Sequence, residues 1–174
     1  MMSKSNKKQL TVLVDTSFLI FLSNPDLGQP HETAKKYYKY FLKHNIQMKL
    51  STIAATEFHQ VQSIIDIIST DNYQVLPYNL NDAIRAADIA FGLGGTQRIN
   101  RDKDNIKYMD DIKLLGQAAS NNIDFIITHD KTTLAKYANS LNKAGIISTK
   151  PIDINEPFDA SHFNGGQSSL DIGT

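Results

Sequence analysis

Cysteine is absent from this chain of 174 residues. Its absence excludes a disulfide framework, a thiolate zinc site, an iron–sulfur cluster and a cysteine nucleophile, and it is compatible with a reducing compartment. A chain of this length buries a sizeable core without such staples. With 41% hydrophobic and 21% charged residues, the composition is that of a globular protein, which excludes wholesale disorder and fibrous repeats.

Net charge is also lacking, because 18 basic side chains balance 18 acidic ones. The balance hides a difference along the chain. Residues 151–174 contain four acidic residues and no Lys or Arg (−4), so residues 1–150 hold 18 positive against 14 negative charges (+4). A mildly basic body attracts polyanions only weakly. We expect one folded domain over residues 1–150 and an acidic, flexible tail over residues 151–174.

Long hydrophobic runs are missing as well, since no stretch approaches the roughly 18 apolar residues that span a bilayer. Residues 10–22 follow three lysines and resemble a signal peptide. Asp15 interrupts that run, at a cost of roughly 2.5–3.5 kcal/mol on insertion scales, and no small-residue cleavage site follows. We expect a soluble, cytoplasmic protein with no membrane partner.

Short apolar runs alternate with segments of helical periodicity along the chain. Strands are expected at residues 10–14, 48–50, 74–76, 125–128 and 146–147, and helices at 16–22, 30–44, 53–69, 80–93, 108–121 and 131–142. Residues 94–107 are polar and are expected to form a loop. This alternation predicts right-handed βαβ units and an α/β domain with a parallel sheet.

Acidic side chains flank the expected strands. Asp15 follows the first strand, Glu57 lies in the helix after the second, and Asp130 follows the fourth. Asp110 and Asp111 begin the helix that leads into the fourth strand. Ligands of parallel sheets bind beyond the carboxyl ends of the strands. Taken singly, Asp15 and Asp130 are equally compatible with helix N-caps, and the adjacent pair with partners of a helix dipole.

Glu57 is the least easily explained as a surface residue. In a single helix over residues 53–69 it shares a stripe with Ile53, Val61, Ile64 and Ile68. A carboxylate on a core stripe is costly unless it is paired or binds a cation, and no basic residue lies within a turn or two. Carboxylates without cysteine suit Mg²⁺ or Mn²⁺. Such ions lower the pKa of an attacking water and stabilise a leaving oxygen, as phosphodiester hydrolysis requires.

Four segments resemble the motifs of PIN-domain nucleases, the family of VapC-type toxin ribonucleases and related enzymes. They are LVDTS at 13–17, STIAATE at 51–57, DIKLLGQA at 111–118 and ITHD at 127–130. They occur in the family's order, and the match extends over about residues 10–147. The resemblance implies a three-layer α/β/α PIN-like domain with strand order 3-2-1-4-5. It also implies metal-dependent cleavage of RNA, with a water molecule as the nucleophile.

The same resemblance implies roles for individual residues. Four acidic residues would hold Mg²⁺ or Mn²⁺ and carry the catalysis: Asp15, Glu57, Asp111 and Asp130. Ser17 and Thr128 would support them by hydrogen bonding. Arg98 and Arg101 in the expected loop would bind the RNA backbone, because Arg pairs with phosphate in a bidentate way. If the chain is a toxin, the resemblance further implies an antitoxin partner and a homodimer.

Asp110 and Asp111 are separated by their position on a helix. Adjacent helical residues point about 100° apart, so only one of them easily faces the edge of the sheet. Steps of three and four residues from Asp111 reach Leu114 and Leu115, an apolar face, whereas a step of three from Asp110 reaches Lys113. The phase therefore predicts Asp111 as the ligand and Asp110 as a surface residue or a helper near the helix start.

Two alternatives stay open at this point. A haloacid dehalogenase-like phosphohydrolase would use Asp15 as its nucleophile, but that family wants a second Asp two residues on, where this chain has Ser17. A non-catalytic PIN-fold module that binds RNA or protein would tolerate neutral replacements, whereas this acidic set is complete. His129 adjoins Asp130, and we interpret it as an ordinary loop residue.

Overall fold

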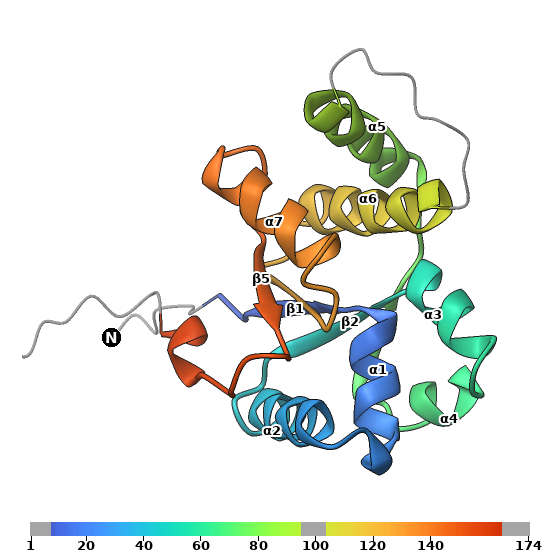
Figure 1. Cartoon of the computed structure of the whole chain (residues 1–174), viewed down its shortest axis with the longest axis vertical. Coiled ribbons are helices and arrows are strands. Elements are labelled where there is room, and N and C mark those ends of the chain that lie inside the picture. The colour runs from blue at the N-terminus through green and yellow to red at the C-terminus, as the bar shows by residue number, and fades with distance from the viewer. Residues whose placement is uncertain (1–7, 95–103, 165–174) are drawn as a thin grey trace, which may run out of the picture.

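The computed structural model of the chain describes residues 8–94 and 104–164 (Figure 1). Its strands are β1 (Thr11–Val14), β2 (Gln47–Ser51), β3 (Tyr73–Leu76), β4 (Phe125–Thr128) and β5 (Lys150–Asp153). Its α-helices are α1 (Thr16–Ser23), α2 (Gln29–Lys43), α3 (Thr52–His59), α4 (Ile64–Ile68), α5 (Leu80–Gly94), α6 (Asp104–Ser120) and α7 (Leu134–Lys143). Two short 3₁₀ helices are η1 (Pro25–Leu27) and η2 (Ala160–Phe163).

The five strands form one parallel sheet in the order β3-β2-β1-β4-β5, which confirms the expected order. Helices cover both faces: α1 to α4 lie on one side of the sheet and α5 to α7 on the other (Figure 1). Alternation along β1 divides the core accordingly. Val12 and Val14 pack with the first group of helices, and Leu13 packs with the second. The three-layer α/β/α architecture is confirmed.

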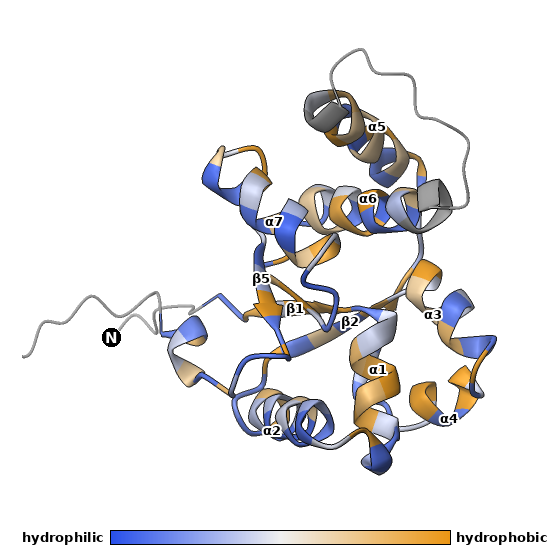
Figure 2. Cartoon of the chain, viewed as in Figure 1, coloured by the Kyte–Doolittle hydropathy of each residue, from blue (hydrophilic) through white to orange (hydrophobic). Residues whose placement is uncertain are grey.

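The hydropathy of the elements matches these positions. Strands β1 and β4 are mostly hydrophobic, as expected of strands buried on both faces. Strand β2 also contains the polar residues Gln47 and Lys49, and α2 is hydrophilic on its outer side (Figure 2). On α2 the residues that face the sheet include Ala34, Tyr37 and Phe41, all buried. None of the helices within the described residues is long and apolar enough to cross a membrane.

Four helices lead into strands through a residue with a left-handed backbone. These residues are Asn45 (φ 52°), Asp71 (φ 54°), Asn122 (φ 51°) and Gly145 (φ 70°). Short polar side chains and glycine tolerate this conformation best. After α6, for example, the N–H of Ile123 donates back to the Ala118 carbonyl over 2.9 Å. This closes the helix and sends the chain directly into β4.

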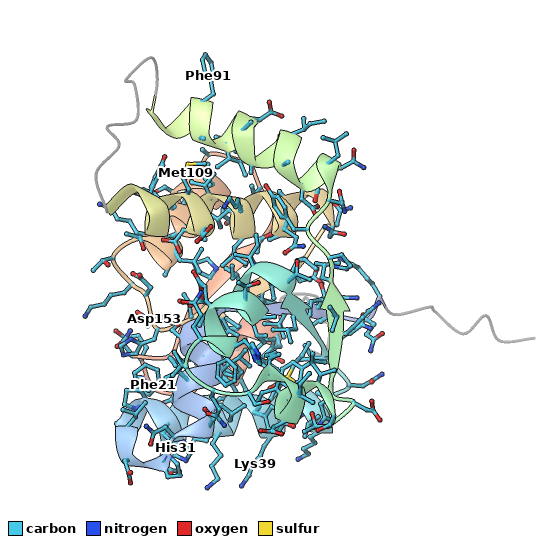
Figure 3. The ribbon with its side chains drawn as sticks, turned by 90° about the vertical axis from the view of Figure 1, so that its right-hand side faces the viewer. Phe21, His31, Lys39, Phe91, Met109 and Asp153 are labelled. Carbon is cyan, nitrogen blue, oxygen red and sulfur yellow. The ribbon has the colours of Figure 1, made fainter. Side chains whose placement is uncertain are left out.

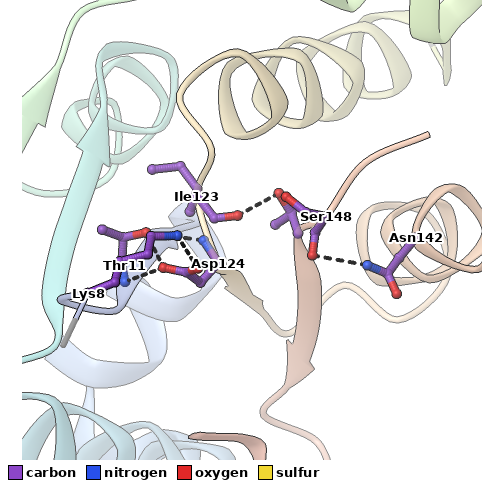
Figure 4. A network of polar contacts seen from close by, with 7 residues as sticks. Lys8, Thr11, Ile123, Asp124, Asn142 and Ser148 are labelled. Atoms are coloured by element: carbon purple, nitrogen blue, oxygen red, sulfur yellow. Dashed lines mark hydrogen bonds and ion pairs between the residues drawn. The ribbon is translucent and has the colours of Figure 1, made fainter. Parts of the chain in front are cut away.

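At the amino ends of the strands, a polar network holds the central strands in register (Figure 4). The Asp124 carboxylate accepts from Lys8 Nζ over 2.7 Å, and from the backbone N–H and the hydroxyl of Thr11, each over 2.9 Å. Thr149 Oγ1 donates to the Ile123 carbonyl over 2.8 Å. Because β1, β4 and β5 are fixed at this end, their carboxyl ends are aligned at the other.

The expected fifth strand at residues 146–147 is wrong. The N–H groups of Ile146 and Ile147 both donate to the Leu141 carbonyl, so these residues close α7 instead. The strand begins at Lys150 and contains Pro151, which is tolerated because β5 is an edge strand paired only with β4. The domain boundary expected at residue 150 therefore falls inside the sheet.

Residues 151–164 of the expected flexible tail are packed onto the domain. Phe158 lies 4.8 Å from Tyr37 between ring centroids, and Phe163 lies 5.0 Å from both Tyr40 and Phe125. Burial of these two aromatic side chains stabilises the packed segment, although its polar composition had suggested a flexible tail. Residues 165–174 lie outside the described part of the chain, so the prediction of a tail stays a prediction for them.

The single helix expected over residues 53–69 is also wrong. The chain forms two short helices, α3 and α4, with Ser63 at the start of the second. The break follows Phe58, whose carbonyl accepts from the N–H groups of both Val61 and Gln62. Val61 is 71% exposed rather than part of a core stripe.

The loop expected over residues 94–107 is shorter than predicted at its carboxyl end. Helix α6 already begins at Asp104, and residues 95–103 lie outside the described part of the chain.

Candidate active site at the carboxyl ends of the strands

Asp15 stands at the end of β1 and caps α1. Its Oδ2 atom accepts hydrogen bonds from the Ser17 hydroxyl over 2.5 Å, the Ser17 N–H over 3.3 Å and the Thr128 hydroxyl over 2.8 Å. The residue is only 7% exposed, and all three of these donors are neutral groups. A buried carboxylate held by neutral donors favours a nearby cation.

Asp130 follows the neighbouring strand β4. Its N–H donates to Thr128 Oγ1 over 2.9 Å, which places Asp130 next to the group that also binds Asp15. Its Oδ1 atom accepts from the N–H and hydroxyl of Thr132 and from the N–H of Thr133, over 2.8–3.0 Å. One oxygen therefore organises the turn before α7 at the carboxyl end of the strand. The N-cap of α7 is Thr133, so the N-cap interpretation of Asp130 is wrong.

Glu57 reaches the same region from α3. Its Oε2 atom accepts from the Thr16 hydroxyl over 2.5 Å, and Thr16 directly follows Asp15. Glu57 is half-buried. The helical stripe on which its selection rested is broken after α3. Its placement beside the start of α1 comes instead from the tertiary packing of α3 against α1.

Asp111 and Asp110 differ in the way that the helical phase predicts. Asp111 is 6% exposed and lies on the buried side of α6 with Leu114 and Leu115. Asp110 is paired with Lys113, with 2.7 Å between its Oδ1 and the lysine Nζ. Helix α6 packs against α3, the helix that carries Glu57. Whether Asp111 is a metal ligand stays a prediction.

Three of the four acidic residues are thus joined through hydroxyl groups at one end of the sheet: Asp15, Glu57 and Asp130. Within residues 8–94 and 104–164, no three Asp, Glu or His side chains are grouped so that they could hold a metal ion together. The chemistry of the donors, carboxylate and hydroxyl oxygens without cysteine, fits a hard cation. Arg98 and Arg101 lie outside the described residues, so their role stays a prediction.

Sequence reasoning missed the contribution of β5 to this end of the sheet. Asp153 ends β5, and its Oδ1 accepts from Asn155 Nδ2 over 2.5 Å; the same amide donates to the His129 carbonyl over 2.7 Å. Figure 3 shows Asp153 and Phe21 along the same side of the molecule. The rule that acidic residues end the strands would have found Asp153, had the fifth strand been placed at 150–153.

The chain is similar to known proteins in its structure but not in its sequence. No family model and no curated protein matches the chain. The structure is similar to a chain of VapBC2 from Rickettsia felis bound to a DNA fragment from its promoter, with a TM-score of 0.54 at 12% identity. The match covers 83% of this chain and 100% of the other.

Two further solved structures are similar to this chain over most of its length. VapBC-1 from nontypeable Haemophilus influenzae matches with a TM-score of 0.54 at 16% identity, covering 84% of this chain and 100% of the other. The DNA-bound VapBC of Salmonella typhimurium matches with a TM-score of 0.50 at 18% identity, covering 84% and 99%. The chain has a PIN-like fold. In this PIN-like domain the ends of β1 and β4 carry Asp15 and Asp130, at the edge where parallel sheets bind ligands.

Proposed function

We propose that this PIN-like chain is a Mg²⁺- or Mn²⁺-dependent endoribonuclease that hydrolyses RNA phosphodiester bonds. One observation carries the proposal: a buried Asp15, held by neutral donors at the end of a central strand, shares its hydroxyl partner Thr128 with Asp130. A bound cation would stabilise such a buried carboxylate, and the resemblance to PIN-domain nucleases supports hydrolysis of RNA as the reaction.

Asp15, Glu57, Asp111 and Asp130 would hold the ion. When bound, such an ion lowers the pKa of an attacking water and neutralises charge that develops on the leaving oxygen. Ser17 and Thr128 orient the Asp15 carboxylate. Their hydrogen bonds all reach Oδ2, so Oδ1 would be the oxygen that contacts the ion.

We further propose that the enzyme is the toxin of a toxin–antitoxin pair, since the similar structures are VapBC complexes. Exposed apolar side chains supply surfaces for an antitoxin and for a second copy of the chain. Val61 and Ile65, 71% and 63% exposed, lie around α4. Leu80, Ile84 and Phe91 are 54–75% exposed on α5.

A non-catalytic RNA- or protein-binding module is the second candidate. The observation that favours it is the lack, among the described residues, of three acidic or histidine side chains close enough to hold an ion together. The phosphohydrolase alternative has less support, because Ser17 uses its hydroxyl as a donor to Asp15 and supplies no second carboxylate.

RNA cleavage with and without metal separates these candidates. Purified protein is incubated with mixed RNA in Mg²⁺, in Mn²⁺ and in EDTA, beside the variants Asp15→Asn and Asp66→Asn. Asp66 is exposed on α4 and controls for the loss of one negative charge. We expect cleavage in metal alone, abolished in Asp15→Asn and retained in Asp66→Asn. Cleavage in EDTA would refute the mechanism, and RNA binding without cleavage would favour the binding module.

A further inference from the structure

Two aromatic rings from distant parts of the chain stack beside the candidate active site. Phe21 lies on α1 and His129 in the loop after β4, and their ring centroids are 4.2 Å apart with an interplanar angle of 27°. Both residues are partly exposed. The side of the molecule that carries Phe21 is the one along which Asp153 lies (Figure 3). A flat aromatic surface therefore borders the carboxylates.

The pair is held in place by its backbone. The His129 N–H donates to Ser17 Oγ over 2.8 Å, and its carbonyl accepts from Asn155 Nδ2 over 2.7 Å. The Phe21 carbonyl contacts the ring nitrogen Nδ1 of the buried His31 at 2.8 Å. Groups that are ordered before binding lose less entropy when a ligand arrives. The structure thus presents this surface already formed.

The backbone of His129 is linked to the Asp15 carboxylate through one side chain, that of Ser17. Ser17 Oγ accepts from the His129 N–H and donates to Asp15 Oδ2 over 2.5 Å. Two hydrogen bonds therefore connect the His129 backbone to the carboxylate at the end of β1. His129 is also bonded neighbour to Asp130. The loop that carries the His129 ring is therefore attached directly to the carboxylate end of the sheet.

We propose that Phe21 and His129 bind one unpaired nucleobase of the RNA, next to the phosphodiester bond that is cleaved. This inference rests on the proposed function and adds a positioning site to it. Proteins that recognise single-stranded RNA stack splayed bases on Phe, Tyr, Trp or His rings. Every base has a π-face, so such stacking tolerates any sequence but requires an unpaired base. The pair therefore selects single-stranded over duplex RNA.

The chain contains its own control for this proposal. Tyr40 on α2 and His44 directly after that helix form a second stacked pair, with centroids 4.0 Å apart and an interplanar angle of 25°. That pair lies where α2 leads into the amino end of β2, the opposite end of the sheet from Asp15. It is likewise a histidine stacked on a carbocyclic aromatic ring. Replacing His44 tests the loss of a stacked histidine without touching the site.

The experiment measures both binding and turnover of a short single-stranded RNA by the full chain. The variants are His129→Ala, His129→Phe, Phe21→Leu and the control His44→Ala, each checked for an unchanged melting temperature. We expect His129→Ala to raise KM on the order of tenfold, in line with the loss of one base–aromatic stack, while kcat changes less. His129→Phe, which keeps a ring and the same backbone hydrogen bonds, should restore KM. Phe21→Leu should resemble His129→Ala, and His44→Ala the wild type.

A single abasic nucleotide, moved along the RNA, identifies the contact. At one position next to the cleaved bond it should weaken binding by wild type on the order of tenfold and leave binding by His129→Ala unchanged, since the stack is already lost there. Equal effects in both proteins would overturn the proposal while leaving the ribonuclease intact. Wild type that neither binds nor cuts RNA would overturn the proposed function as well, so the two failures are distinguishable.

Discussion

Thr128 Oγ1 donates a hydrogen bond to Asp15 Oδ2 over 2.8 Å, and this bond joins the carboxyl ends of the adjacent strands β4 and β1. The same hydroxyl oxygen accepts from the Asp130 N–H over 2.9 Å. Thr128 is fully buried. One hydroxyl group therefore fixes two acidic residues relative to each other, because it donates to the Asp15 carboxylate and accepts from the Asp130 N–H.

Replacing Thr128 by Val should separate these two residues. The valine has nearly the same shape but leaves the Asp15 carboxylate short of a donor, which costs about 1–3 kcal/mol when a buried polar group loses its partner. We expect a lower melting temperature and RNA cleavage reduced by at least tenfold. Thr128→Ser keeps the hydroxyl and is the matched control. Equal cleavage by the valine and serine variants would show that the hydroxyl does not position Asp15.

Asp111→Asn and Asp110→Asn should have unequal effects. Asp111 is buried on the sheet side of α6, whereas Asp110 is paired with Lys113 near the surface. Exposed ion pairs contribute little, about 0–1 kcal/mol. We expect Asp111→Asn to lower cleavage by orders of magnitude and Asp110→Asn to change it several-fold at most. The measurement is the cleavage rate at saturating Mg²⁺, and an inactive Asp110→Asn with an active Asp111→Asn would contradict the assignment.

Metal binding should stabilise the folded chain, because an ion that binds only the folded state raises its stability by mass action. We expect Mg²⁺ or Mn²⁺ at a hundred times its Kd to contribute about 2.7 kcal/mol to wild type, and much less to Asp15→Asn. Without metal, Asp15→Asn should be at least as stable as wild type, since Asp15 and Asp130 share the Thr128 hydroxyl and two neighbouring carboxylates repel one another. Thermal unfolding in metal and in EDTA measures both. A large loss of stability in metal-free Asp15→Asn would make Asp15 a structural residue.

Gly116→Ala should destabilise the domain through a steric clash. Gly116 lies where α6 contacts α5, and a Cβ atom there would come within 2.6 Å of the Ala86 backbone nitrogen. Relieving this contact requires the two helices to move apart, and overpacking of this kind typically costs about 1–3 kcal/mol. Gly92→Ala is the control: it is also helical, no atom of residues 8–94 or 104–164 lies within 4 Å of its added Cβ, and Ala favours helix by about 1 kcal/mol. Chemical unfolding should move the two variants in opposite directions.

Tyr73 should make the fold sensitive to alkali. Burial raises the pKa of the Tyr73 phenol well above its ordinary value of 10.0, and its hydroxyl has no hydrogen-bond partner among the described residues. Because the folded state holds this proton more tightly than the unfolded state, its stabilising contribution is complete below pH 10 and is lost as pH rises above 10. Tyr73→Phe should remove that part of the loss and be no less stable at neutral pH. Unfolding measured at pH 7 and pH 10.5 tests this, with Tyr137→Phe, a partly exposed tyrosine on α7, as the control.

The sequence by itself determined the strands β1 and β4, because short apolar runs buried on both faces need no partner to be recognised. Motif order also indicated the strand order and selected Asp15 and Asp130, which follow those strands. The phase of α6 separated Asp111 from Asp110, since helical geometry is local. For the strands and the helical phase, the deciding information lies within a few consecutive residues, whereas the strand order came from the order of four motifs along the chain.

Only the tertiary structure decided the rest. Pro151 looks unsuited to a strand until β5 is seen to be an edge, and residues 151–164 look like a tail until Phe158 and Phe163 are seen to pack on α2. The contacts Thr128–Asp15, Thr16–Glu57 and Phe21–His129 join segments that are distant in sequence. Such contacts follow from how helices and strands pack in three dimensions, and no local pattern of residues encodes them.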